Sequence, residues 1–280
     1  MNNIAEKHVT IPPDFQFSQA NLQDYTDCPR RFQLTYLLKL PWPSLEAEPV
    51  TEHEKNLYLG TAFHRMVYQH IMGVPEEELQ KMIDDRDLKL WWNNYLQYRP
   101  YDISGILYPE TALSCHGGGF SITGKYDLIA LSEDRALIID WKTSRKKPSR
   151  TFLQNRIQTR LYLYLLIEGG RYFNNGKPFA TDRVEMMYWF PSFPESPEIF
   201  SYNSYEYQKD KEFLTHLIEE INSLKEFRLT EEVKHCLYCY YRSLCDRGIK
   251  AGAIDEMEGD MEIKETDINL DFEQIGEIEF

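Results

Sequence analysis

The sequence predicts a mixed α/β fold in which a central mixed β-sheet is flanked by helices. The order of the periodic segments indicates this class, because helical patterns come first and are followed by a meander of apolar strands, a helix and another strand. The chain is also long and apolar enough for a large core, with 280 residues and 42% hydrophobic composition. We expect a single domain over residues 1–252, followed by an acidic tail over residues 253–280.

Helices are expected in the first third of the chain. Ser18 is a typical N-cap residue, and residues 19–28 and 29–40 predict two short helices. Apolar and aromatic residues recur at helical spacing over residues 57–73. We expect the charged, Trp-containing residues 75–100 to continue as helix.

Strands are expected in the middle of the chain. Residues 105–115 read as one strand, and the apolar runs 124–131 and 136–141 enclose the polar turn "SEDR", which predicts a hairpin. The remaining expected elements are a helix over 151–170 that ends at two glycines, a strand over 183–190 and a helix over 207–227.

The charge is distributed unevenly along the chain. The formal net charge is −14, but the segment from Asp255 to Glu279 holds eleven acids and one lysine, so the rest of the chain is only mildly acidic. Residues 141–160 contain seven Lys or Arg and no acid. This excess predicts a surface that binds the phosphates of DNA, with six candidate contacts: Arg145, Lys146, Lys147, Arg150, Arg156 and Arg160.

The acidic tail interleaves apolar residues with its carboxylates. The simplest interpretation is a solvated end, because runs of like charge are usually disordered. The alternative is a segment that lies on the basic stretch, with carboxylates in place of phosphates, or that docks on a partner.

A membrane location is not expected. The longest apolar stretches are much shorter than a bilayer span, and the first residues, "MNNIAEKHVT", lack the basic and apolar regions of an export signal. We therefore expect a cytoplasmic protein.

Each strand of the hairpin carries one aspartate that an apolar strand does not require. If the turn is symmetric, cross-strand partners have residue numbers that sum to 267, which pairs Asp127 with Asp140. Opposed residues have Cβ atoms about 5 Å apart, and like charges placed so are destabilising. The pair therefore needs a positive group between the carboxylates, or one acid must be protonated.

A divalent cation would meet that need. Lys142 lies on the same strand face as Asp140, and Trp141 offers its backbone carbonyl. Two carboxylates and a carbonyl suit Mg²⁺ or Mn²⁺, and the lysine could orient a water molecule and neutralise charge on a phosphate. The alternative is a solvated ion pair at the end of the strand.

These residues resemble the core of the PD-(D/E)XK nuclease superfamily, with Asp127 followed by Asp140-Trp141-Lys142. Other motifs extend the resemblance to residues 17–248: "GTAFHRMV" is similar to the helix that presents a metal-binding histidine, and Gln158 and Tyr162 match the Q-x-x-x-Y helix of the RecB-like branch. The resemblance implies that His64, Asp127, Asp140 and the Trp141 carbonyl bind the metal, with Glu110 as a further acidic residue. It also implies that Gln158 and Tyr162 support Lys142 and the DNA.

Four of the five cysteines form a pattern. Cys236, Cys239 and Cys245 have the spacing C-x₂-C-x₅-C, which alone fits zinc or an iron–sulfur cluster. Cys28 lies in a Cys-Pro-x-x-Phe element that resembles the N-terminal half of the split [4Fe–4S] staple of AddB-type and CRISPR-adaptation nucleases. The resemblance implies a staple that joins the helices of residues 18–40 to residues 234–248, with zinc as the alternative metal. Cys115 has no place in the pattern.

The predicted function is hydrolysis of phosphodiester bonds in DNA. The resemblance implies a Mg²⁺- or Mn²⁺-dependent exonuclease that acts on single-stranded ends, in repair, recombination or CRISPR and other antiviral defence, and possible partners are helicase, recombination or CRISPR-adaptation proteins. The rival hypothesis is a non-catalytic DNA-binding or scaffold subunit of such a complex.

Overall fold

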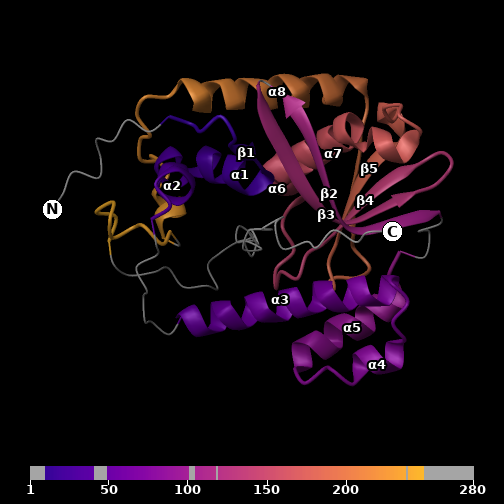
Figure 1. Ribbon diagram of the computed structural model, residues 1–280. Helices are drawn as coiled ribbons and strands as arrows, with labels where there is room; N and C mark the ends of the chain where they lie inside the picture. Colours follow the sequence, from indigo (N-terminus) through magenta and orange to yellow (C-terminus); the bar gives the residue numbers. More distant parts are fainter. Residues whose placement is uncertain (1–9, 41–48, 101–104, 118, 238, 249–280) are drawn as a thin grey trace, which may run out of the picture.

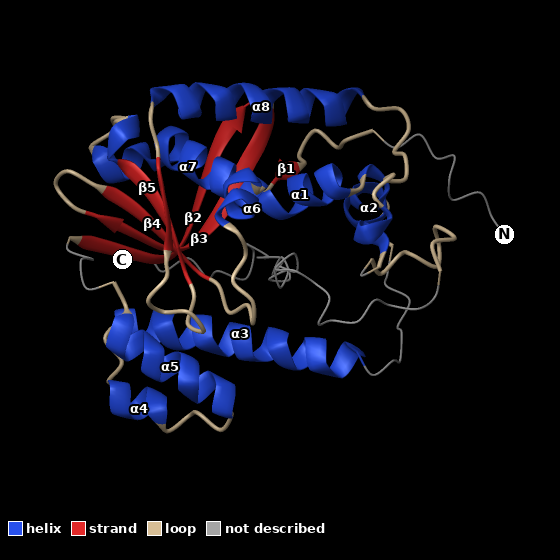
Figure 2. Ribbon diagram, turned by 180° about the vertical axis from the view of Figure 1, so that it is seen from behind, coloured by secondary structure: helices blue, strands red, loops and turns tan. Residues whose placement is uncertain are grey.

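The computed structural model describes residues 10–40, 49–100, 105–117, 119–237 and 239–248. In this part of the chain a six-stranded mixed sheet lies between two layers of helices (Figures 1 and 2). The predicted fold class is confirmed. The acidic tail over residues 253–280 lies outside the described residues, so its predicted roles remain predictions.

Strand β3 is the centre of the sheet. Strand β2 pairs with it antiparallel over nearly its whole length, while β1 and β4 share its other edge at different ends. Strand β5 continues the sheet parallel to β4, and β6 is antiparallel to β5. The strands are β1 (Gln16–Phe17), β2 (Ile106–Gly117), β3 (Phe120–Leu131), β4 (Ala136–Trp141), β5 (Val184–Trp189) and β6 (Glu198–Ser201). The short strands β1 and β6 were not expected from the sequence.

All six residues of β4 are buried, because helices cover both faces of the sheet. Ala136 and Ile138 join the core on the side of α7, whereas Leu137, Ile139 and Trp141 join the core on the side of α3. A strand covered on both faces needs apolar side chains at consecutive positions, which explains the run "ALII".

One helical layer consists of α3 (Pro49–Ile71), α4 (Glu76–Gln80) and α5 (Arg86–Tyr98) (Figure 1). The expected single helix over residues 75–100 is therefore wrong. Asp85 accepts hydrogen bonds from the backbone N–H groups of Asp87 and Leu88, which satisfies the N-terminus of a new helix. Asp85 also pairs with Lys55 of α3 at 2.9 Å, and this ion pair joins the two helices.

The other layer contains α1 (Gln19–Asp27), α6 (Arg150–Asn155), α7 (Ile157–Gly169) and α8 (Ser204–Ser223) (Figure 2). The expected helix over 151–170 is divided at Arg156, whose backbone is extended, with φ −65° and ψ 141°. Ser18 caps α1 as predicted, in a capping box with Asn21. Helix α2 (Pro29–Phe32) continues into the π-helix η2 (Gln33–Leu37). Short 3₁₀ helices complete the described chain: η3 (Gly170–Asn174), η4 (Thr181–Arg183) and η5 (Val233–Cys236).

The first helices lie against the segment that follows α8. The rings of Phe32 and Phe227 stack at 5.9 Å, and the Arg30 N–H donates to the Arg228 carbonyl at 3.1 Å. The Tyr241 hydroxyl donates to the Leu40 carbonyl at 3.0 Å. These contacts bring together the two chain segments that carry the cysteine pattern.

Within the described residues, every helix is too short or too polar to cross a lipid bilayer.

The cap at Asp85 gives a direct test of the divided helix. We expect Asp85→Ala to lower the free energy of unfolding by about 1 kcal/mol, because the first turn of α5 loses its acceptor. Asp85→Asn keeps an acceptor and should retain most of the cap. Urea unfolding monitored by circular dichroism measures both variants, and equal losses for the two would contradict the capping role.

Candidate active site

The hairpin of β3 and β4 has the predicted register. The last paired residues before the acids are Leu128 and Ile139, whose numbers sum to 267 as expected. Asp127 and Asp140 are the next positions of the two strands. The acids therefore stand at the end of the paired segment, where the two strands begin to separate.

Strands β2 and β3 change the face that they present at this point. Tyr126 packs in the core beneath α7, but Leu128 packs in the core beneath α3, although alternate residues of a regular strand share a face. On β2, the position opposite Asp127 is Glu110, whose φ of 50° is uncommon for a residue other than glycine. The distortion leaves Asp127 and Glu110 on the side of α3.

Asp127 is held by groups from two elements. Its carboxylate lies 3.4 Å from His64 Nδ1 of α3 and accepts the backbone N–H of Trp141 at 2.8 Å. Burial alone would raise the pKa of Asp127, but His64, the Trp141 N–H and Lys142 together lower the pKa below its usual value. These contacts therefore favour the charged form of the Asp127 carboxylate.

Glu110 completes a group of potential metal ligands. One ligand atom each of His64, Glu110 and Asp127 lies within 4.8 Å of the others. Lys125 Nζ lies 2.5 Å from Glu110 Oε2 and holds this carboxylate from the side. The three side chains come from α3, β2 and β3, so the group depends on the packing of α3 on the sheet.

Asp140 faces the opposite layer. Its Oδ1 accepts the Gln158 side-chain N–H of α7 at 2.6 Å, and its Oδ2 lies 3.0 Å from Lys142 Nζ. Asp127 therefore contacts α3 and Asp140 contacts α7, while the expectation that the two acids share one metal ion remains a prediction. The group of three potential ligands described above does not include Asp140.

Lys142 interacts electrostatically with both acids. It pairs with Asp140 and also lowers the pKa of Asp127. Its backbone N–H donates to the Trp189 carbonyl of β5 at 2.9 Å, and its ammonium lies 5.6 Å from the centre of the Tyr188 ring. Strand β5 therefore binds the backbone of this lysine and places an aromatic ring near its ammonium group.

Trp141, Gln158 and Tyr162 have structural partners as well. The Trp141 ring is buried and packs against Tyr95 and Trp189, which fixes the end of β4. The Tyr162 hydroxyl donates to the Lys125 carbonyl at 2.6 Å, and α7 passes so close to β3 that a Cβ at Gly124 would lie 3.0 Å from Leu165 and 3.2 Å from Tyr162. Gln158 reaches Asp140, whereas Tyr162 binds the strand that carries Asp127.

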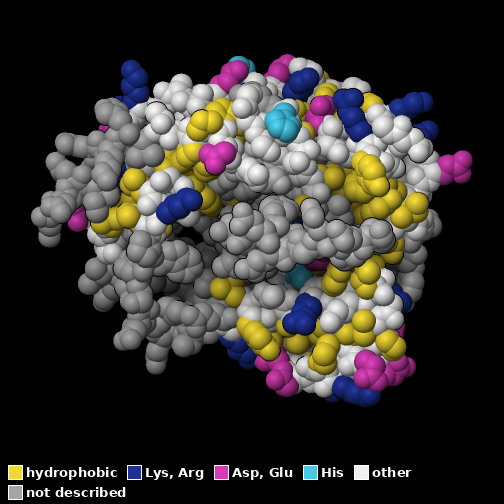
Figure 3. Space-filling model, in the orientation of Figure 1, with side chains coloured by type: hydrophobic (Ala, Val, Ile, Leu, Met, Phe, Trp, Pro, Cys, Tyr) yellow, Lys and Arg dark blue, Asp and Glu magenta, His cyan; other side chains and the backbone are white. Residues whose placement is uncertain are grey.

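The six basic residues of the predicted DNA surface have different environments. Arg145 and Lys146 are exposed, and Arg145 donates to the Asn56 side chain at 3.2 Å. Arg150 is also exposed but pairs with Glu198 at 3.0 Å. Lys147 pairs with Glu198 at 2.6 Å, Arg160 pairs with Asp210 at 2.6 Å, and Arg156 is buried beside Phe152. On the face shown in Figure 3, the described Lys and Arg side chains are scattered among acidic and apolar ones.

The thiols of the four patterned cysteines lie near enough to influence one another electrostatically, but among the described residues no three of their sulfur atoms lie within 4.8 Å of one another. Burial and the neighbouring thiols of Cys239, Cys28 and Cys236 raise the pKa of Cys245 to about 11. Burial is also the main reason that the pKa of Cys239 is raised, with smaller effects from Cys28 and Cys236. The guanidinium groups that follow Cys28 act in the opposite direction, Arg31 on Cys239 and Arg30 on Cys245.

Cys115 lies apart from this cluster, on β2. Burial and the Glu168 carboxylate raise the pKa of its thiol to about 11.

The sequence interpretation did not include Lys125 or Tyr188, which lie beside Glu110 and Lys142 of the site. Lys125 could have been found, because it precedes Asp127 by two residues and so shares its strand face. Tyr188 carried no signal, since an aromatic residue in an apolar strand is ordinary core.

A comparison with protein-family models agrees with the motifs. The family model described as the PD-(D/E)XK nuclease superfamily matches residues 16–246. The crystal structure of SSO0001 is similar with 15% identity and a TM-score of 0.40, covering 86% of this chain and 90% of that one. A candidate exonuclease from Eubacterium rectale is similar with 12% identity and a TM-score of 0.45, covering 76% of this chain and 84% of that one. No curated protein matches. Because the family match spans most of the chain and every residue of the site, this chain belongs to the PD-(D/E)XK nuclease superfamily.

Proposed function

We propose that this protein is a Mg²⁺- or Mn²⁺-dependent deoxyribonuclease that hydrolyses phosphodiester bonds. The observation that carries the proposal is the group of His64, Glu110 and Asp127 beside the ion pair of Asp140 and Lys142. Phosphodiester hydrolysis can use a metal ion to activate water and a lysine to neutralise charge on the phosphate, and these residues could supply both.

The ligand group fits a small divalent cation. Ligands at about 2.1 Å from one octahedral ion lie about 3 to 4 Å apart, which is compatible with three atoms within 4.8 Å of one another. Two carboxylates suit Mg²⁺ or Mn²⁺, and the imidazole favours Mn²⁺ because Mg²⁺ prefers oxygen ligands. Asp140 and the Trp141 carbonyl stay proposed ligands, with Asp140 also serving to orient Lys142.

The ion, when bound by these residues, would polarise the phosphate and lower the pKa of a water molecule. Lys142 would orient the attacking water and neutralise charge that develops on the phosphate. Asp140 holds the ammonium of Lys142 at 3.0 Å, and Gln158 holds Asp140 at 2.6 Å. Tyr162, through the Lys125 carbonyl, would keep β3 and its Asp127 in position.

The substrate proposed is the end of a single DNA strand. Support comes from the resemblance of the Gln158 and Tyr162 helix to the RecB-like branch and from the basic residues that follow Lys142. Arg145 and Lys146 are exposed and would contact phosphates first, without reading sequence. Lys147, Arg150, Arg156 and Arg160 would contribute only if the DNA competed for their present partners. A cytoplasmic role in repair, recombination or CRISPR-type defence, with a helicase or adaptation partner, follows from the same resemblance.

The spacing of the four cysteines and its resemblance to the split staple support a [4Fe–4S] group. Cys28, Cys236, Cys239 and Cys245 would supply the four thiolates that such a cluster needs. Arg30 and Arg31 supply positive charge beside them, which would offset the negative charge of the thiolates. The group would tie α1 and α2 to the segment after α8. Zinc remains the alternative metal, since four thiolates also bind zinc.

The catalytic assignment predicts loss of cleavage without loss of fold. Asp127→Ala, Asp140→Asn and Lys142→Met should each slow cleavage by at least about 100-fold, because each removes a charge from the reacting site. Asp140→Asn retains an acceptor for Gln158. Rates on labelled DNA with Mn²⁺ measure the effect, and Lys209→Ala on α8 is the control. Cleavage by Asp140→Asn at the wild-type rate would exclude Asp140 from the reaction.

The metal group predicts opposite effects for two neighbouring residues. Glu110→Gln should weaken Mn²⁺ binding about 10- to 100-fold, because a charged ligand is lost. Lys125→Met should strengthen Mn²⁺ binding, because a positive charge leaves the vicinity of the cation. Calorimetric titration with Mn²⁺ in the absence of DNA measures both affinities. Unchanged affinity in Glu110→Gln would remove Glu110 from the ligand set.

The staple predicts a metal content and a pattern of damage. Protein purified without oxygen should be brown, with broad absorption at about 400 nm and about four iron atoms per chain. Cys28→Ser and Cys239→Ser should lose iron to the same extent, whereas Cys115→Ser should keep it. Stoichiometric zinc without iron in the anaerobic protein would contradict the iron–sulfur assignment.

A further inference from the structure

We propose that Gln23 is a positioning residue that couples the cysteine cluster to the catalytic helix α7. The inference rests on the nuclease function proposed above and extends it, because it assigns a role in the reaction to a side chain of α1. Three contacts carry it: the cap of α7, the anchor of Gln23 beside Cys28, and the contact of α7 with Asp140.

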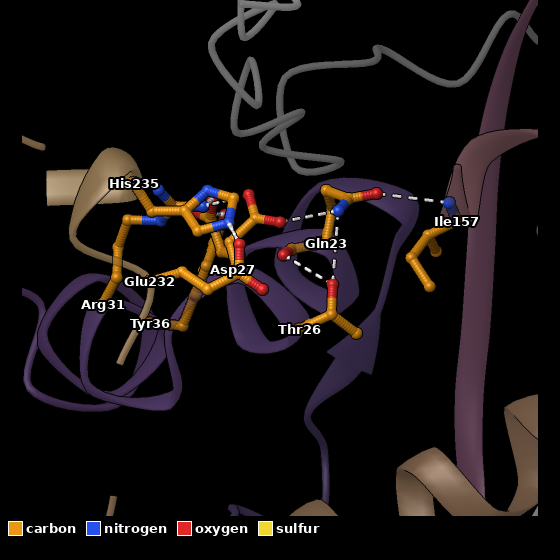
Figure 4. A network of polar contacts seen from close by, with 9 residues as sticks. Gln23, Thr26, Asp27, Arg31, Tyr36, Ile157, Glu232 and His235 are labelled. Atoms are coloured by element: carbon orange, nitrogen blue, oxygen red, sulfur yellow. Dashed lines mark hydrogen bonds and ion pairs between the residues drawn. The ribbon is translucent and has the colours of Figure 1, made fainter. Parts of the chain in front are cut away.

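Helix α7 begins without a cap from its own chain segment. Its N-cap residue is Arg156, which makes no side-chain hydrogen bond to the first turn. Gln23 of α1 supplies the missing acceptor, since its Oε1 accepts the Ile157 N–H at 3.2 Å across 134 residues of sequence (Figure 4). The first N–H groups of a helix have no partner within the helix, so an acceptor from another element helps to fix where the helix starts.

Gln23 is anchored beside the cysteine cluster. Its Nε2 donates to Asp27 Oδ1 at 2.8 Å and to Thr26 Oγ1 at 3.2 Å (Figure 4). The Arg31 guanidinium donates to Asp27 Oδ2 at 2.6 Å. Asp27 is the residue before Cys28, and Arg31 is the third residue after Cys28. The orientation of the Gln23 amide therefore depends on the chain segment that Cys28 would attach to the cluster.

The other end of the connection is the catalytic pair. Ile157 is followed directly by Gln158, whose amide donates to Asp140 at 2.6 Å, and Asp140 holds Lys142 at 3.0 Å. Ile157 and Gln158 are both buried, with 2% and 3% of their surface exposed. A shift of the first turn would therefore displace the side chains packed around these residues. A small displacement of this turn moves the group that orients Lys142.

The consequence is that disruption of the cluster should slow the chemical step. Loss of the anchor at Cys28 frees Gln23, the α7 start shifts, and Lys142 loses its orientation. A displacement of about 1 Å can cost up to about 100-fold in rate. The ligands His64, Glu110 and Asp127 do not lie on α7, so Mn²⁺ affinity should stay within about twofold of wild type.

The test uses the full-length protein and a compensating pair. Gln23→Met removes both hydrogen-bonding groups at nearly constant volume and should lower kcat about 10- to 100-fold, with KM changed less than about threefold. Gln23→Glu keeps the acceptor for Ile157 but faces the Asp27 carboxylate, so it should also be slow. Adding Asp27→Asn to Gln23→Glu restores a donor between the two side chains and should recover most of kcat. Gln80→Met, at an exposed position of α4, is the matched control.

Hydrogen exchange gives a readout that does not depend on activity. The Ile157 amide should exchange at least about tenfold faster in Gln23→Met and in Cys28→Ser than in wild type, and the double variant should add less than about twofold to either single one. Wild-type kcat in Gln23→Met, or additive effects in the double variant, would overturn the coupling. If wild-type protein does not cleave DNA, the proposed function fails, and the exchange of Ile157 still decides whether the coupling exists.

Discussion

Two carboxylates at the end of the β3–β4 hairpin impose the constraint on which the site depends. Asp127 and Asp140 occupy adjacent strand positions in register, where like charges on one face would repel each other. Each acid has its own helix partner, because Asp127 lies beside His64 of α3 while Asp140 accepts the Gln158 amide of α7. Lys142 acts on both acids. The site is therefore assembled by both helical layers.

This division explains why distant parts of the chain matter to the site. Helix α3 supplies the imidazole, and its position depends on the apolar core that it shares with α5 and the sheet. Helix α7 supplies the amide that holds Asp140, and its start is capped from α1. In the proposed coupling, the cysteines at positions 28, 236, 239 and 245 would hold α1 in place. Under this proposal, phosphodiester chemistry at one edge of the sheet would depend on contacts made by both ends of the described chain.

Sequence patterns predicted the fold class, the hairpin register and the residues around the site. The face change of β2 and β3 could not be predicted from the sequence. Glu110 has a positive φ, a backbone conformation that is usually found at glycine, and no glycine marks this position. The break at Arg156 was missed because the apolar pattern continues across it. Likewise, the sequence shows seven basic residues without a nearby acid, but Glu198 and Asp210 approach three of them only in the folded chain. Partners far apart in sequence leave no local signal.

Cleavage by the wild-type protein tests the central claim most directly. End-labelled linear single-stranded DNA and a closed single-stranded circle are incubated with Mn²⁺ or with a chelator. The account predicts that the linear strand is degraded from an end with Mn²⁺ and is stable with chelator, and that the circle is resistant. Equal degradation of the linear strand with and without metal, or no degradation under any divalent ion, would contradict it.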